Sequence, residues 1–421
     1  MRPRSVIEYA GSRFPSSRRL PGAHPNAQRA HKRAAALHDG SMRSDCRGAA
    51  AWTPLGVALL AVSIAPASAL RGGKSPSGPR QLDHVTPQAR MEYLRKAIVW
   101  RPTRIPAMDL MRGPEGEGAF KPDQSVTCEY VKPDEPMSGA TPKFTCDLGG
   151  GDVVKVKYGK NNGEVYAEVA ASRLLWALGF GADHMYPVQV TCRDCPIEPW
   201  YWSSEPRVDE KKFELATIER KLDGKTIEAS GKEGWTWAEL DRVDERAGGA
   251  PVAHRDALKL LAVLLQYSDT KAQNQRLVCL PDSFVRNESG DEDCTKPLMF
   301  PQDLGVVFGK ANLLNNDSVN LQSWQDVPVW RDPRQCVAHL KKSLTGTLEH
   351  PRISEAGRKF LADLLSQLSD TQIRDMFAVA RFDRRGRKIR TPQGERPATI
   401  DDWVGVFKKK RDEIVNARCP Q

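Results

Sequence analysis

Apolar and polar positions alternate in the segment 143–158, on both sides of three consecutive glycines. This alternation predicts two strands joined by a tight turn. The next segment, 163–178, carries apolar residues at helical spacing and is followed by Gly179 and Gly181, which predicts a helix that ends at these glycines. Further strands are predicted over 187–191 and 275–280, and the segment 213–224 is predicted to be a strand that runs into a connection between two lobes.

The second half of the chain has mostly helical spacing. Residues 255–267 are apolar over nearly every turn, which predicts a buried helix. Near the start, Thr86 followed by Pro87 predicts a helix that runs to about residue 100. The polar segments 281–297 and 383–397 are predicted to be loops. Helices are also predicted over 332–344, 353–367, 370–381 and 400–416.

The chain has 421 residues, enough for a catalytic unit of two lobes with a large core. Its net charge of +10 is uneven, because residues 1–50 hold ten Lys and Arg against three Asp and Glu, a net of +7. The rest of the chain contributes only +3. A nucleic-acid partner is therefore not expected.

The longest apolar run, 55–66, is too short to span a bilayer comfortably. Basic residues precede it and Ala-Ser-Ala follows at 67–69, which is the layout of a secretory signal peptide cleaved near Leu70. We expect a leader over 1–69 with translation starting at Met42. The mature chain is then extracytoplasmic, either periplasmic or secreted, and has no membrane span. The alternative is an uncleaved N-terminal anchor helix.

Eight of the nine cysteines follow this leader. An even number of cysteines in an exported chain predicts disulfides, although sequence alone does not fix their connectivity. The Cys-x-x-Cys of 192–195 would also suit a zinc or redox half-site, but no second such motif or His pair accompanies it. Pairing of neighbours along the chain suggests Cys128–Cys146, Cys192–Cys195, Cys279–Cys294 and Cys336–Cys419.

Asp269 and Asn274 stand five positions apart in SDTKAQN, and Asp303 follows in QDLGVVFG after a strand and a polar loop. An Asp and an Asn on one loop, with a second Asp after a hairpin, are the base and metal ligands that a kinase-type phosphotransferase uses. The first Asp orients or deprotonates the acceptor, and the other two residues hold Mg²⁺. The alternative is two surface turns, where Asp and Asn are common.

The turn of Gly149, Gly150 and Gly151 suits a hairpin that lies over phosphates, because glycine allows the backbone to approach a ligand closely. Lys155 and Lys157 lie on one face of the strand that follows, and one of them is expected to reach the α/β-phosphates. The alternative is an ordinary turn beside a solvated strand face.

Taken in order, these features resemble the atypical branch of the protein-kinase-like superfamily. The resemblance is strongest to the secretory-pathway casein kinases and the type II phosphatidylinositol 4-kinases, with the toxin kinase HipA more distant. AEVAASRLLWALGF is similar to the Glu-x-Ala-Ala…Leu-Gly helix of those families, which favours Glu168 over Glu164 as the partner of the strand lysine. SDTKAQN is similar to their Asp-Arg-His-x-x-Asn loop, with Lys271 where His stands. QDLGVVFG is similar to their Asp-Asn-Gly…Phe-Gly metal segment.

The resemblance covers about residues 143–310 and implies an α+β, bilobal protein-kinase-like fold stapled by disulfides. Its N-lobe is small and β-rich with one main helix, and its C-lobe is larger and mostly helical. We expect an N-terminal extension over 70–125, the N-lobe over 126–222 and the C-lobe over 223–421.

The function implied is an exported, ATP- and Mg- or Mn-dependent phosphotransferase whose acceptor (protein, lipid head group or sugar) is open. Two alternatives remain: a catalytically inactive pseudokinase or partner-binding module, and a kinase-fold enzyme that transfers a nucleotidyl group. The expected site residues are Lys157 or Lys155 with Glu168 at the phosphates, Asp269 and Lys271 at the acceptor, and Asn274 and Asp303 at the metal.

Overall fold

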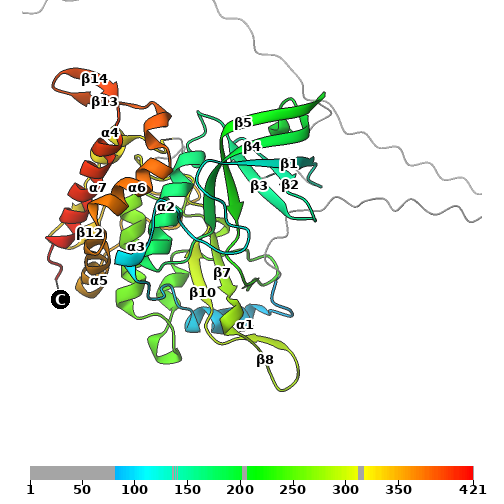
Figure 1. Ribbon diagram of the computed structural model, residues 1–421. Coiled ribbons are helices and arrows are strands. Elements are labelled where there is room, and N and C mark those ends of the chain that lie inside the picture. The colour runs from blue at the N-terminus through cyan, green and yellow to red at the C-terminus, as the bar shows by residue number, and fades with distance from the viewer. Residues whose placement is uncertain are drawn as a thin grey trace, which may run out of the picture. The chain divides into compact units, whose positions relative to one another are not determined.

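The computed structural model describes residues 81–134, 137, 139, 141–201, 206–311 and 317–420. All of them belong to the second of the two units into which the chain divides, 69–421. The predicted leader, the start at Met42 and the cleavage site near Leu70 lie outside the described residues. The described part is a mixed α+β fold that contains a five-stranded barrel, seven α-helices and several small sheets (Figure 1).

The barrel consists, in spatial order, of β1 (Gln124–Val131), β2 (Lys143–Asp147), β3 (Val153–Tyr158), β5 (Arg207–Arg220) and β4 (His184–Pro196). It closes where β1 pairs in parallel with β4, and its other neighbours are antiparallel. Alternate side chains point inward, so Phe144, Tyr158 and Phe213 pack together inside. The predicted hairpin is present as β2 and β3, whereas β4 and β5 are longer than predicted.

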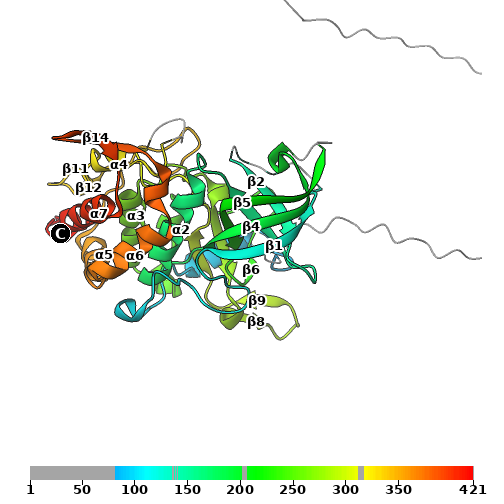
Figure 2. The same cartoon turned by 45° about the horizontal axis from the view of Figure 1, so that its top comes forward.

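Helix α2 (Glu164–Leu178) lies against the outside of the barrel and is buried on nearly all sides. It contacts β3, β4 and β5 on one side and α6 (Asp370–Val379) on another, so it lies between the barrel and the C-terminal helices (Figures 1 and 2). It ends at Gly179, whose φ of 86° is the left-handed conformation that favours glycine after a helix. The predicted helix over 163–178 is therefore confirmed.

The other helices share one large core. α3 (Val252–Leu265) is buried from Asp256 onward and packs against α5 (Glu355–Ser366). α7 (Ile400–Val415) packs against α5, α6 and the short α4 (Leu321–Gln325). α1 (Pro87–Lys96) begins at the predicted N-cap Thr86, although it ends earlier than predicted. A three-stranded sheet has the order β10 (Leu298–Pro301), β7 (Gln275–Cys279) and β6 (Lys225–Thr226).

Three predictions need correction. The predicted loop 281–297 contains the hairpin β8 (Phe284–Arg286) and β9 (Glu292–Cys294), and the predicted loop 383–397 contains β13 (Lys388–Thr391) and β14 (Gly394–Pro397). The helix predicted over 332–344 is wrong, because the chain there forms β11 (Trp330–Asp332) and β12 (Val337–Ala338). Cys336 has a left-handed φ of 48°, and the backbone N–H groups of Ala338 and His339 donate to Pro351 and Val329 rather than along a helix.

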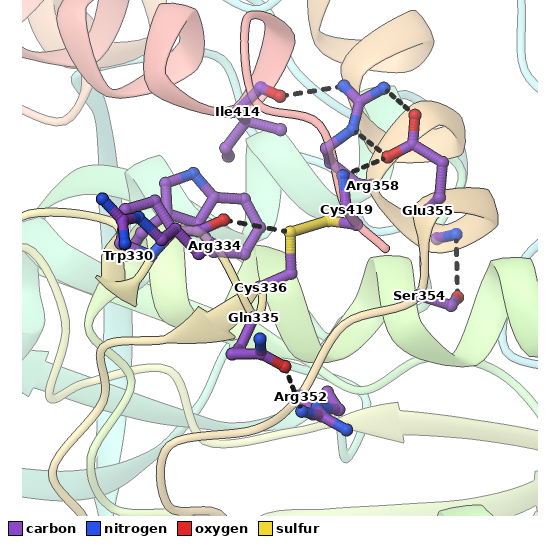
Figure 3. The surroundings of a disulfide bond; sticks show 12 residues. Trp330, Arg334, Gln335, Cys336, Arg352, Ser354, Glu355, Arg358, Ile414 and Cys419 are labelled. Atoms are coloured by element: carbon purple, nitrogen blue, oxygen red, sulfur yellow. Dashed lines mark hydrogen bonds and ion pairs between the residues drawn. A yellow bond between two sulfur atoms is a disulfide. The ribbon is translucent and has the colours of Figure 1, made fainter. Parts of the chain in front are cut away.

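All four suggested cysteine pairs are disulfide-bonded. The bond with the longest loop joins Cys336 to Cys419, 83 residues apart, and so ties the end of the chain to the segment between β11 and β12 (Figure 3). Beside it, Glu355 accepts hydrogen bonds from Arg358 and from the backbone N–H of Cys419. Among the helices of the described residues, none is long and apolar enough to cross a membrane.

Candidate functional site

Lys157 lies on the outer face of β3, because Val154 and Val156 take the inward positions of the alternation. Its ammonium donates to Glu168 over 2.5 Å and to Glu164 over 2.9 Å. The Lys157 side chain is only 3% exposed. The predicted ion pair between the strand lysine and Glu168 is thus present, and Glu164 shares it.

The two glutamates meet one lysine because they are four positions apart, which places them one above the other on α2. Glu168 is the more deeply buried, with a side chain 4% exposed against 15% for Glu164. The second carboxylate oxygen of Glu168 is buried and has no hydrogen-bond partner among the described residues. Glu168 therefore pairs with Lys157 and still has one carboxylate oxygen that can accept a hydrogen bond.

Lys155, the other lysine of the strand, does not reach Glu168. It pairs with Glu219 of the neighbouring strand β5 over 2.7 Å, and Lys221 holds the other oxygen of the same carboxylate. The structure therefore distinguishes two lysines that the sequence left as alternatives, and it adds Glu219, which sequence reasoning missed. The strand pairing that brings Glu219 to Lys155 has no local signal in the sequence.

Asn274 and Asp303 are brought together by the pairing of β7 with β10, which sets Gln275 opposite Pro301. Just beyond that pair, the backbone N–H groups of Gln302 and Asp303 both donate to the carbonyl of Asn274, over 2.8 and 3.2 Å. The side-chain amide of Asn274 donates to the carbonyl of Asp269 over 2.8 Å. All three predicted acidic-site residues are therefore linked by direct hydrogen bonds.

The Asp-Leu-Gly segment also lies against α2. The carboxylate of Asp303 accepts a hydrogen bond from the N–H of Gly305 over 3.1 Å. A Cβ at Gly305 would stand 2.4 Å from Cγ of Glu164, so only glycine fits there without displacing Glu164. This contact places the segment beside the glutamate that shares Lys157.

Lys157, Glu164, Glu168 and Asp303 form one cluster of interacting charges. Burial lowers the pKa of Lys157, but Glu164, Glu168 and Asp303 outweigh it and hold that pKa well above its usual value. Burial raises the pKa of Glu168 well above its usual value, and Lys157 offsets this only in part. Burial also raises the pKa of Asp303, yet Lys157 and the N–H of Gly305 bring it below the usual value. Near neutral pH, Lys157 is a cation and Asp303 an anion.

Asp269 lies next to the other predicted acceptor-site residue. Its carboxylate is 3.4 Å from the ammonium of Lys271 and accepts from the hydroxyl of Ser343 over 3.4 Å. The segment 343–348 is bonded to the same loop, since the backbone N–H and the hydroxyl of Thr347 both donate hydrogen bonds to Thr270. Ser343 and Thr347 support the site but were missed by sequence reasoning, which assigned Ser343 to a helix.

The three glycines of the β2–β3 turn are not brought to this cluster. In the hairpin register, Asp147 faces Val153 at the turn, while Lys143 faces Lys157 at the other end. Four residues of strand separate the turn from Lys157, about 13 Å. The turn is held instead by Arg220, which pairs with Asp152.

A cavity of about 880 Å³ is lined by Lys155, which stands two residues before Lys157 on β3, and by its partner Glu219. Its other walls include the start of β3, the segment 115–118, His184 and Tyr186 of β4, the segment 220–224 at and after the end of β5, and the segment 280–282 after β7. This volume falls within the usual range of small-molecule sites.

The side chains that the sequence predicted as metal ligands, Asn274 and Asp303, offer oxygen atoms. Within the described ranges, no group of three or more His, Cys, Asp and Glu side chains is arranged to hold a metal ion. The predicted pair is one carboxylate, Asp303, and one amide, Asn274, whose nitrogen is already bonded to Asp269. Beside them the side-chain oxygen of Gln302 is buried and lacks a hydrogen-bond partner in the described part of the chain. Such oxygens suit a hard divalent cation that keeps several of its waters.

No protein-family model matches this chain, and no curated protein matches it in sequence. Among solved structures, the chain is similar to the proinflammatory kinase CtkA of Helicobacter pylori, with a TM-score of 0.38 and 11% sequence identity. The matched region covers 70% of this chain and 97% of that one.

Proposed function

We propose that this protein is an exported, ATP- and metal-dependent phosphotransferase with a bilobal, kinase-like fold. The observation that carries the proposal is the buried ion pair of Lys157 with Glu168, set beside an Asp303 that is bonded to Asn274. Phosphoryl transfer requires a cation that binds the phosphates and anionic oxygen ligands that bind a divalent metal.

In this proposal Lys157 binds the α/β-phosphates of ATP, and the two glutamates of α2 hold its ammonium in place. The rest of the nucleotide extends into the cavity that Lys155 and Glu219 line. The depth of Lys157, 3% exposed, supports this role because a phosphate can meet it with little competition from water.

Asp303 and the amide oxygen of Asn274 would hold Mg²⁺ or Mn²⁺. When bound, the metal neutralises charge on the phosphates. Asp303 suits this task because the low pKa of its carboxyl keeps it charged. Asn274 suits it because its amide nitrogen is fixed on Asp269, which leaves the amide oxygen for a ligand.

Asp269 would orient or deprotonate the hydroxyl of the acceptor, which is a protein, a lipid head group or a sugar. Lys271, 3.4 Å from that carboxylate, would balance charge on the transferred phosphoryl group. The hydrogen bond from Ser343 supports this assignment, since it fixes one oxygen of Asp269 and leaves the other beside Lys271.

The proposal divides the chain into a leader over 1–69, an extension over 70–125, an N-lobe over 126–222 and a C-lobe over 223–421. The N-lobe would comprise the barrel and α2. Four disulfides support an oxidising compartment outside the cytoplasm.

Incubation of the purified, oxidised protein with ATP labelled on either the γ- or the α-phosphate tests this proposal. We expect metal-dependent transfer of the γ-label to the protein itself, to an added acceptor or to water, with no transfer of the α-label. Transfer of the α-label would show a nucleotidyl transferase instead. Nucleotide binding without transfer of either label would show a binding module.

A further inference from the structure

A third lysine lies at the site and has no role in the proposal above. Lys143 is the first residue of β2, and the strand register sets it directly opposite Lys157. Residues directly opposite each other in an antiparallel pair project from the same face, with Cβ atoms about 4.5–5.5 Å apart. Lys143 therefore stands on the outer face of the barrel next to Lys157.

Lys143 is buried, with 9% of the residue exposed, yet no hydrogen bond or ion pair joins its ammonium to any of the residues that the structure describes. The ammonium lies 5.5 Å from the centre of the Trp200 ring, in η2 (Pro199–Tyr201), and close to Gly139. Lys155 and Lys157 differ, because each of them has a carboxylate partner.

This environment disfavours the charge of Lys143. Burial lowers its pKa, the neighbouring Lys157 lowers it further, and Glu164 and Asp303 oppose these effects without overcoming them. A cation–π contact offsets only part of the free energy that is needed to bury an ammonium group. Two lysines on facing positions also repel each other. An anion bound between the two ammonium groups would relieve both costs at once.

We propose that Lys143 is a second phosphate-binding lysine, which holds the phosphoryl groups of ATP that lie beyond those bound by Lys157. The inference rests on the proposed function, because it needs a nucleotide at Lys157. Lysine suits the role as a flexible point charge. The site would therefore discriminate among nucleotides by the number of their phosphates and favour a triphosphate over a monophosphate.

The test is calorimetric titration of ATP and of AMP, each with Mg²⁺, into the wild type, Lys143→Met, Lys143→Arg and Lys212→Met. Lys212 is an exposed lysine of β5 and serves as the matched control. We expect Lys143→Met to weaken ATP binding at least about tenfold and to leave AMP binding unchanged, as loss of one charged hydrogen bond implies. Lys143→Arg should restore most of the ATP affinity, and Lys212→Met should match the wild type.

Unchanged ATP affinity in Lys143→Met would overturn the inference and leave the proposed function standing. A wild type that binds no ATP would overturn both. If Lys143→Met does not fold, a crystal structure of the wild type with a non-hydrolysable ATP analogue decides. The Lys143 ammonium should then lie within hydrogen-bond distance of a phosphate oxygen, and an ammonium still directed at Trp200 would end the proposal.

Discussion

The backbone N–H of Asp303 donates a hydrogen bond to the carbonyl oxygen of Asn274 over 3.2 Å, although a strand, a hairpin and a second strand separate the two residues in sequence. Because β7 and β10 are paired just before this contact, the position of one residue fixes that of the other. The contact depends on backbone atoms, so either side chain can be changed while the two segments stay in register.

Lys157→Met should reduce stability, and more so at high pH. The change leaves Glu164, Glu168 and Asp303 buried around a missing cation, and breaking a buried pair in this way costs about 3–5 kcal/mol. The pKa of Glu168 is raised in the folded protein, so the folded state takes up its proton more readily and its stability falls as pH rises above about 4.5. The loss in Lys157→Met should therefore be smaller at pH 5 than at pH 8.

Chemical denaturation at the two pH values measures this difference. Lys155→Met is the control, because Lys155 is 26% exposed and Glu219 keeps Lys221 as a second partner. An equal loss for both variants, or one independent of pH, would contradict the electrostatic account.

Asp269→Asn should lower the rate of phosphoryl transfer by about 10²–10⁴, the usual contribution of an acid–base group. Nucleotide affinity should change little, because this carboxylate faces Lys271 and Ser343 rather than Lys157. Ser343→Ala should lower the rate less, since it removes only one hydrogen bond of the same carboxylate. Steady-state kinetics on the three proteins provides the check, and a large loss of nucleotide affinity in Asp269→Asn would place the residue elsewhere in the mechanism.

Removal of the disulfide between Cys336 and Cys419 should cost more stability than removal of the one between Cys192 and Cys195. The loops they close span 83 and 3 residues. From the entropy of loop closure, the first disulfide should stabilise the folded protein by about 4–5 kcal/mol and the second by about 1–2 kcal/mol. Denaturation of the two double Cys→Ala variants under non-reducing conditions tests the order, and equal losses would refute it.

Glu355, beside the long-range disulfide, should make stability sensitive to acid (Figure 3). Its hydrogen bonds from Arg358, together with that from the N–H of Cys419, lower its pKa to about 2 from the usual 4.5. A lowered pKa contributes stability above about pH 4.5 that is lost as pH falls towards 2. Glu355→Gln should therefore be about 1–3 kcal/mol less stable than the wild type at pH 7. A difference that persisted undiminished at pH 2 would contradict this assignment.

Local signals predicted much of the fold. The helix that carries Glu168 has apolar residues at helical spacing and a glycine at its end, and both features act within a few residues. The segment 332–344 shows the opposite case. Its backbone is set by a disulfide to Cys419 and by hydrogen bonds to loop 268–270, and these partners are remote in sequence. Its apolar spacing therefore predicted a helix that tertiary contacts prevent.

The residues of the candidate site also fall into a group that the sequence predicted and a group that it did not. The order of Lys157, Glu168, Asn274 and Asp303 was visible in the sequence, because each stands in a short motif. Lys143 and Glu219 were not, because they join the site through the register of strand pairs. The register also decides which end of the β2–β3 hairpin faces the cluster, and it directs the three glycines away from Lys157.

Asp303 offers the most direct test of the central claim, that this cluster binds a nucleotide together with a divalent metal. Calorimetric titration of ATP into the wild type and Asp303→Asn, with and without Mg²⁺ or Mn²⁺, measures the metal-dependent part of nucleotide binding. Asparagine keeps an acceptor for the N–H of Gly305 but lacks the charge, so the variant should fold with a melting temperature close to that of the wild type. The account predicts that the wild type binds ATP more tightly with metal and that Asp303→Asn loses this gain. A folded variant that keeps the full metal-dependent affinity would contradict it.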